Sequence, residues 1–186
     1  SARYAVRGQK TMNDNLVISR ATLLDTDDIM VVIEEARESI GRLGIDQWQY
    51  GYPNREVVLR DIEAGVSFTV REGESGALCG TFAAIDSGDP AYNEIFEGAW
   101  LTDGPYIALH RFCVARACRG KGVSDAIIGY LKKYCAGKGF ASLRIDTHHG
   151  NYPMIRMLER TGFTRCGVVY LKNGEHRVAF ELPVEG

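Results

Sequence analysis

A strand, a glycine turn and a helix follow one another over residues 106–134, and this order constrains the fold more than any other feature of the chain. The apolar run 106–114 predicts a strand, and apolar residues at helical spacing resume at Val123. Between them stands Arg119-Gly120-Lys121-Gly122. Glycine lets a ligand approach the backbone, and the N–H groups and dipole at a helix start favour an anion. The turn therefore predicts a phosphate site.

Two common phosphate loops do not match this turn. A Walker loop ends in Gly-Lys-Ser/Thr and has an earlier glycine, whereas here Gly122 follows Lys121 and the earlier glycine is missing. A dinucleotide-binding loop needs a third glycine where this chain has Asp125. Both classes of nucleotide site are therefore excluded at this turn.

The turn resembles the Arg/Gln-x-x-Gly-x-Gly/Ala signature of the GCN5-related N-acetyltransferase (GNAT) superfamily, with Ser124 in place of the final Gly or Ala. A second landmark of that superfamily follows in the expected order. Asn151 precedes a helical apolar pattern that closes on Gly162-Phe163, where Asn151 suits an N-cap and Gly162 a left-handed helix end. The resemblance extends over residues 16–183, nearly the whole chain.

The resemblance implies a mixed, mostly antiparallel α/β (α+β) sheet of six to seven strands, with helices on both faces and splayed fourth and fifth strands. We expect a single acetyltransferase domain over residues 15–186, preceded by a disordered or artificially added leader over residues 1–14. A chain of 186 residues that is 45% hydrophobic is long enough for one sizeable core. Besides the turn region, the pattern predicts strands at 16–20 and 141–146, helices at 25–40 and 53–62, and hairpins at 66–85 and 163–182.

Charge and cysteine content narrow the class of protein further. A formal net charge of −2 argues against a nucleic-acid partner bound by bulk electrostatics. The five cysteines are odd in number and lack a Cys-x-x-Cys pair, which favours reduced thiols in a cytoplasmic protein without a metal site. No apolar run is long enough to span a bilayer, so we expect no membrane partner.

The resemblance assigns acetyl-CoA (coenzyme A) as cofactor and distributes its contacts along the chain. Backbone groups of Phe112, Cys113 and Val114 would bind the pantetheine amides, as an added strand does. The pyrophosphate would lie on Arg119, Gly120, Lys121, Gly122, Val123 and Ser124. Asn151 and Met154 would line the far side of the cofactor. For Cys113, a small buried side chain is favoured over a nucleophile.

The reaction that the resemblance implies needs a route for the amine's proton. His110 is the first candidate, because an imidazole with its ordinary pKa near 6.5 suits that transfer and a histidine stands at this offset in the arylalkylamine branch. A strand histidine satisfied by a neighbouring carbonyl is the alternative. His148 is the second candidate. Many relatives place a tyrosine where this chain has Leu158, so Tyr170, Tyr106 or Ser124 would have to protonate the thiolate, or it leaves unaided.

Two features point to the acceptor. Five acids and no Lys or Arg occur over residues 86–110, whereas eight bases and only Asp125 occur over 111–144, which would suit a cationic amine beside an anionic cofactor. A solvated acidic loop explains the acids equally well. The aromatic side chains Trp48, Tyr50, Tyr52 and Trp100 could enclose the amine, although core packing or a homodimer contact would also account for them.

These observations predict an acetyl-CoA-dependent N-acetyltransferase, an acyltransferase that transfers the acetyl group directly to a primary amine of a small molecule. Two alternatives remain open. A peptide or protein amine would need an open groove in place of an aromatic pocket. A non-catalytic acyl-CoA-binding sensor is compatible with Leu158.

Overall fold

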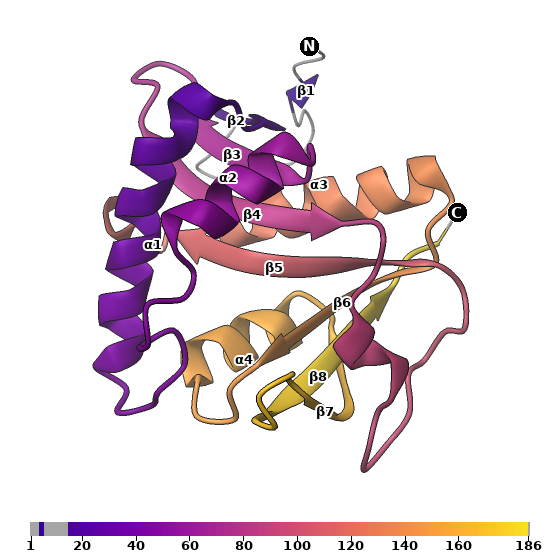
Figure 1. Cartoon of the computed structure of the whole chain (residues 1–186). Coiled ribbons are helices and arrows are strands. Elements are labelled where there is room, and N and C mark those ends of the chain that lie inside the picture. Colours follow the sequence, from indigo (N-terminus) through magenta and orange to yellow (C-terminus); the bar gives the residue numbers. More distant parts are fainter. Residues whose placement is uncertain (1–3, 6–14, 186) are drawn as a thin grey trace. The chain divides into compact units, whose positions relative to one another are not determined.

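The computed structural model describes residues 4–5 and 15–185, which group into two compact units. The first unit comprises residues up to Ala84 together with His110–Tyr130, and the second comprises Ile85–Leu109 and the chain from Leu131 onward. The boundary between the units falls inside strand β5 (Tyr106–Val114), after Leu109, and inside helix α3 (Val123–Lys138), after Tyr130. Both elements are labelled in Figure 1. Each unit is described separately below.

The sheet of the first unit is antiparallel. Its strands follow the order β1 (Tyr4–Ala5), β2 (Leu16–Arg20), β3 (Ser67–Glu72) and β4 (Leu78–Ile85, of which Ile85 falls in the second unit). Pairing runs from Leu16 opposite Glu72 and from Ser67 opposite Ala83. The unit also holds residues 110–114 of β5, after which the Ala115 amide donates to the Cys79 carbonyl at 2.8 Å. This bond ties the end of β5 to β4.

Helices cover both faces of this sheet. The aromatic rings of Phe68 and Phe82 stack at 5.1 Å, and Tyr130 of α3 packs tilted against both. Because side chains alternate along a strand, Thr81 and Ala83 point to the opposite face. That face meets α1 (Thr26–Gly41) and α2 (Arg55–Glu63). α1 follows the short helix η1 (Leu23–Asp25). α2 is capped by Asn54, whose side chain accepts a hydrogen bond from the Val57 amide at 3.0 Å.

The second unit has a mixed sheet in the order β5, β6 (Ser142–Thr147), β8 (His176–Pro183) and β7 (Thr164–Tyr170). β5 and β6 are parallel and pair only from Tyr106 opposite Ser142 to Ala108 opposite Arg144, although both strands continue further. They are the fourth and fifth strands when the two-residue β1 is left out, and this short pairing is the splay that was expected. α4 (Tyr152–Arg160) contacts β7, and the short helix η2 (Pro90–Asn93) lies in the connection from β4 to β5.

A buried ion pair fastens that connection to the sheet. Glu181 of β8 is fully buried and accepts hydrogen bonds from the Leu101 and Thr102 amides, from Ser142 and from Arg144. Hydrogen bonds from Ser142, Arg144 and Thr102 lower the pKa of Glu181 below its ordinary value, even though burial, the largest single influence, acts to raise it. The segment before β5 is thus held by charge as well as by packing.

The predicted elements are confirmed, with small shifts at their ends. Of the predicted leader, the structure describes only Tyr4–Ala5, which pair with β2, and the rest lies outside the described residues. The single domain over 15–186 stays a prediction. In the part of the chain that the structure describes, no helix is both long and apolar enough to cross a membrane.

Candidate active site

The glycine turn has the open backbone that a phosphate site needs. Gly120 and Gly122 have φ angles of 75° and 77°, values that L side chains rarely adopt. A Cβ added at Gly120 would meet no described atom within 4 Å, so the space above the turn is open. Helix α3 begins immediately afterwards at Val123, and its first N–H groups have no acceptor within the helix. The turn and the helix start can therefore accept an anion.

Side chains from α1 hold the approach to this turn. Arg116, in the short helix η3 (Arg116–Cys118), pairs with Glu38 at 2.8 Å. The Arg119 Nη2 atom donates to the Ser39 hydroxyl at 2.8 Å. Because Ser39 is neutral, the charge of Arg119 is not compensated by this contact and remains available to an anion. Lys121 is exposed on the same turn.

The end of β5 presents backbone rather than reactive side chains. Phe112 and Cys113 are buried, while Val114 is partly exposed. Burial raises the pKa of the Cys113 thiol well above its ordinary value, so the thiolate that a nucleophile requires is strongly disfavoured. Cys113 thus fills space at this position, as the residue type suggests.

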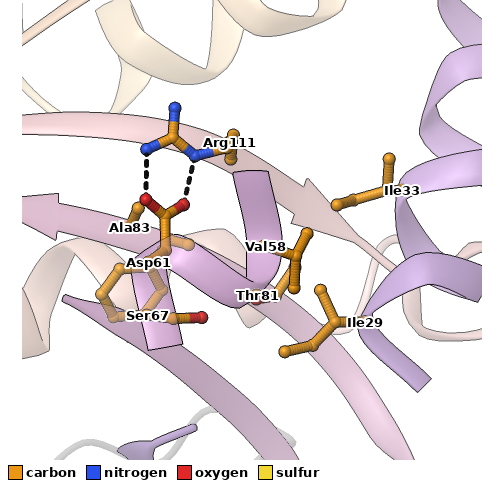
Figure 2. Close-up of a pocket in the computed structure, with 9 residues that line it drawn as sticks. Ile29, Ile33, Val58, Asp61, Ser67, Thr81, Ala83 and Arg111 are labelled. Atoms are coloured by element: carbon orange, nitrogen blue, oxygen red, sulfur yellow. Dashed lines mark hydrogen bonds and ion pairs between the residues drawn. The ribbon is translucent and has the colours of Figure 1, made fainter. Parts of the chain in front are cut away.

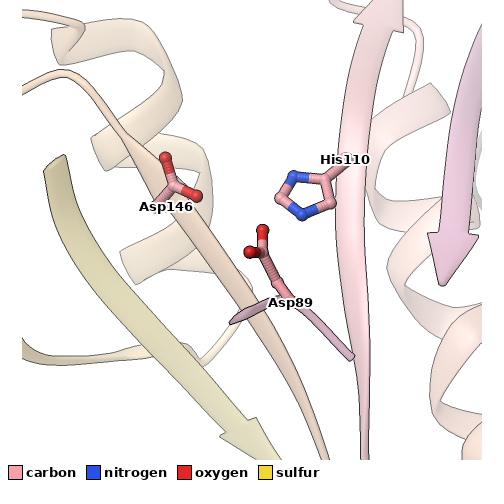
Figure 3. Close-up of side chains that lie close together, drawn as sticks. All are labelled: Asp89, His110 and Asp146. Carbon is pink, nitrogen blue, oxygen red and sulfur yellow. The ribbon is translucent and has the colours of Figure 1, made fainter. Parts of the chain in front are cut away.

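His110 lies on β5 next to a break in the strand's regular geometry (Figure 3). Arg111 has a φ angle of 50°, in the left-handed region, and His110 and Arg111 are two partly exposed positions between the buried stretches 107–109 and 112–113. The His110 side chain is partly buried, as a group that exchanges protons with a ligand would need to be.

Three of the predicted acceptor residues lie in the segment between α1 and α2. Tyr50 is 82% exposed and Tyr52 47% exposed, so their rings are accessible in this unit. Trp48 is partly buried, and its carbonyl accepts a hydrogen bond from Arg37 Nε at 3.1 Å. Arg37 Nη2 also donates to the Pro53 carbonyl at 2.5 Å. One arginine of α1 therefore fixes both ends of the aromatic segment 48–53.

A second arginine contacts the same segment from the strand side. Arg111 donates to both carboxylate oxygens of Asp61 in α2, at 2.5 and 2.9 Å, and to the Tyr52 hydroxyl at 2.9 Å. The ion pair lies beside a cavity of about 10 Å³, large enough for about one water molecule (Figure 2). Its apolar lining comes from Ile29, Ile33 and Val58. The sequence motifs did not identify Arg111 or Asp61. The available signal for Arg111 was its charge inside the mostly apolar run 106–114.

Residues predicted for the cofactor's far side and for proton transfer lie at the start of α4 in the second unit. Asn151 is buried and caps α4 by accepting from the Met154 amide at 3.3 Å. His148 Nδ1 accepts from the Gly150 amide at 2.9 Å, which places the proton of the neutral ring on Nε2. Its ring stacks on that of His149, which stacks in turn on His176. Each of the three imidazoles thus has a stacking partner, and the role of His148 in proton transfer stays a prediction.

Trp100 is engaged with its own unit. Its ring lies 4.3 Å from the guanidinium carbon of Arg144, and its Nε1 donates to the Tyr92 carbonyl at 3.0 Å. Packing therefore explains Trp100, and its acceptor role stays a prediction.

The three hydroxyl groups considered as general acids differ in burial and in hydrogen bonding. The Tyr106 hydroxyl bonds to the backbone of Asp89, at 3.0 Å from its amide and 3.3 Å from its carbonyl. Tyr170 is 49% exposed and packs edge-on against Phe96. Ser124 is partly buried at the start of α3, and Leu158 is fully buried. Of the three residues, Tyr170 is thus the exposed one, Tyr106 and Ser124 are partly buried, and the Tyr106 hydroxyl is bonded to backbone.

Two carboxylates of the second unit approach each other. Asp89 and Asp146 each have an oxygen within 4.8 Å of the other (Figure 3). The buried Tyr92 hydroxyl donates to Asp146 at 2.5 Å, and burial together with this carboxylate raises the pKa of Tyr92 well above its ordinary value. Of the five acids counted over residues 86–110, Asp89 is the one in this cluster, and Asp86, Glu94, Glu97 and Asp103 are exposed. A solvated acidic loop therefore still explains most of these acids.

Comparisons with known proteins show the family and the fold. The family model "Acetyltransferase (GNAT) family" matches residues 27–163. The crystal structure of a GNAT-family acetyltransferase from Streptococcus agalactiae 2603 is 35% identical, with a TM-score of 0.81 over 92% of this chain and 96% of that one. A GNAT-family acetyltransferase from Listeria monocytogenes 4b F2365 is 22% identical, with a TM-score of 0.70 over 91% and 95% of the two chains, which shows the shared fold.

A curated relative matches over a shorter stretch. The streptothricin acetyltransferase of Escherichia coli is 28% identical over 61 residues, which make up 33% of this chain and 35% of that protein. The match thus spans about a third of the relative's length. The family model extends over most of the chain, and the Streptococcus structure repeats its fold almost from end to end. The chain belongs to the GNAT family of acetyltransferases.

Proposed function

We propose that this protein transfers the acetyl group of acetyl-CoA directly to a primary amine of a small molecule. The observation that carries the proposal is the open glycine turn at the start of α3, in a chain of the GNAT family. The match to a streptothricin acetyltransferase supports a small molecule as the acceptor.

The residues of the first unit fit the cofactor in three ways. The positive φ angles of Gly120 and Gly122 and the free space above Gly120 let a pyrophosphate reach the backbone N–H groups. Arg119 and Lys121 add charge, and residues 112–114 offer strand backbone to the pantetheine amides. Acetyl-CoA supplies an acetyl group activated as a thioester. Asn151 and Met154 of the second unit remain proposed contacts.

His110 is the proposed general base. An alkyl ammonium must lose a proton before its nitrogen can form a bond to the acetyl carbon, and a neutral imidazole can accept that proton. As the nitrogen–carbon bond forms, the carbon–sulfur bond breaks and the thiolate leaves. The nitrogen then gives up a second proton to become the neutral amide, and this proton balances the one that the thiolate takes up. Since Leu158 is fully buried where relatives carry a tyrosine, a hydroxyl of Tyr170 or Ser124 would protonate the thiolate, or it leaves unaided.

A thiol-release assay tests this proposal. The protein is incubated with acetyl-CoA and a panel of small amines, aromatic and aliphatic, and with peptides bearing a free N-terminus. Release of free thiol that depends on a small amine supports the proposal. Release only with peptides would favour the peptide acetyltransferase, and binding of acetyl-CoA without release would favour the sensor.

A further inference from the structure

The conformation of Arg111 is unusual for its residue type. A backbone φ angle of 50° is strained for a residue with a long side chain in a strand, and such a conformation persists only when the surroundings fix it. Its neighbours Leu109 and Phe112 are buried, so the strand cannot relax by moving this stretch into solvent. Something other than backbone preference must stabilise Arg111.

The guanidinium supplies that stabilisation. Its two bonds to Asp61 are bidentate, and the side chains are only 12% and 14% exposed (Figure 2). Burial by itself would lower the pKa of Arg111, but the interactions with Tyr52 and Asp61 outweigh it and raise the pKa. Arg111 is therefore a cation. Because the guanidinium is planar, its two hydrogen bonds to Asp61 also fix the direction of the remaining N–H groups.

One of those N–H groups is directed at the aromatic segment. Arg111 Nη1 donates to the Tyr52 hydroxyl, while the Tyr52 ring stays 47% exposed. Arg37 fixes the backbone of the same segment at Trp48 and Pro53, but it does not orient the Tyr52 side chain. The orientation of this accessible ring is thus set by Arg111 and, through it, by Asp61.

We propose that Arg111 is a positioning residue that sets acceptor binding, because its guanidinium, gripped by Asp61, orients the exposed ring of Tyr52 toward the amine substrate. This inference rests on the proposed function. It adds that the acceptor presents an apolar or aromatic surface to Tyr52, and that the Asp61–Arg111–Tyr52 chain acts on the amine and not on acetyl-CoA.

The test separates the Michaelis constants of the two substrates. Tyr52→Phe removes the hydroxyl and keeps the ring, whereas Asp61→Asn removes the charge that grips Arg111. We expect KM for the amine to rise about 3- to 10-fold in Tyr52→Phe, the factor that corresponds to the net contribution of one ordinary hydrogen bond, and more in Asp61→Asn. KM for acetyl-CoA should stay within about twofold of the wild type.

Asp27→Asn is the matched control, because it breaks an exposed ion pair between α1 and α2, with Arg55 at 2.6 Å. It should change neither KM. The double variant Tyr52→Phe/Asp61→Asn should be no worse than Asp61→Asn alone, because the two changes act through one chain of contacts. If Asp61→Asn does not fold, Tyr52→Phe alone decides the matter.

The outcomes distinguish this inference from the proposed function. A wild-type protein that releases no thiol with any amine overturns the proposed function itself. An active wild-type protein whose Tyr52→Phe variant keeps the wild-type amine KM, or changes both KM values equally, overturns only the positioning role of Arg111.

Discussion

At the residue scale, the left-handed backbone of Arg111 interrupts the regular strand geometry of β5. Leu109 is fully buried and Phe112 nearly so, and between them His110 and Arg111 are both partly exposed. A regular strand would send these two side chains to opposite faces. Arg111, whose φ angle of 50° lies outside the strand region, directly follows the proposed base, and Asp61 holds its side chain.

Removing the imidazole should change how the reaction depends on pH. With His110→Ala, the amine must deprotonate in solution, so the acid limb of the kcat/KM profile should move up toward the pKa of the free amine. The loss should be about 100-fold or more near pH 7 and smallest at pH values above the amine's pKa. Profiles of wild type and variant, measured by thiol release, give the comparison. Superimposable shapes would remove His110 from the role of base.

The five thiols should be unreactive in the folded protein. All five cysteines are buried, and burial raises the pKa of Cys135 to about 12. Burial and the neighbouring Cys118 thiol, whose sulfur lies 2.8 Å from that of Cys79, likewise raise the pKa of Cys79 to about 12. Because the thiolate is the reactive form, Ellman's reagent at pH 8 should find almost no thiol before urea is added and all five afterwards. Rapid colour from the native protein would show that one of these sites opens.

At the element scale, the turn before α3 should distinguish acetyl donors that carry a pyrophosphate from those that lack one. Arg119→Ala should weaken acetyl-CoA binding about 10-fold, the size of a charge-assisted hydrogen bond at an exposed position. Binding of S-acetylpantetheine, which has no pyrophosphate, should not change. Calorimetric titration of both donors measures this, and an equal loss for both would place Arg119 away from the pyrophosphate.

Glu181 should control the acid stability of the segment before β5. Its folded-state pKa lies below the ordinary value of 4.5, so its contribution to stability is present above that value and is lost as pH falls through the folded-state pKa. Glu181→Gln leaves Arg144 buried without its charge partner and should lower the free energy of unfolding by about 3–5 kcal/mol at pH 7. Below pH 4.5, the stability of the variant should fall less steeply than that of the wild type, because the variant lacks the Glu181 carboxyl.

Urea unfolding at pH 7 and pH 4 measures both effects. Asp27→Asn, at an exposed ion pair, should cost less than about 1 kcal/mol. A Glu181→Gln variant as stable as this control would mean that the buried pair does not secure the segment.

The sequence predicts the regular elements well because periodicity and caps are local signals. The strand at 16–20 has the predicted ends, and Asn151 caps α4 as expected. The helix predicted from Pro53 begins at Arg55 because the Asn54 side chain, and not the proline, supplies the cap. The short helices η2 and η3 carry too few residues to show a period. Contacts such as Arg111 with Asp61 join residues far apart in sequence, so no local pattern contains them.

At the scale of the whole molecule, each unit carries one of the two landmarks read from the sequence. The glycine turn belongs to the first unit, and the Asn151-capped helix to the second. The family model covers residues of both, and the Streptococcus relative matches 92% of the chain. The proposed activity therefore belongs to the whole chain rather than to either unit.

Transfer of a labelled acetyl group tests this account most directly. The protein is incubated with acetyl-CoA that carries a deuterated acetyl group, together with the amine panel, and the amines are analysed by mass spectrometry. We expect at least one small amine heavier by one labelled acetyl group, with an equal amount of free CoA and no such product with heat-unfolded protein. Acetyl-CoA that stays intact with every amine, or that is hydrolysed without a labelled amine, would contradict it.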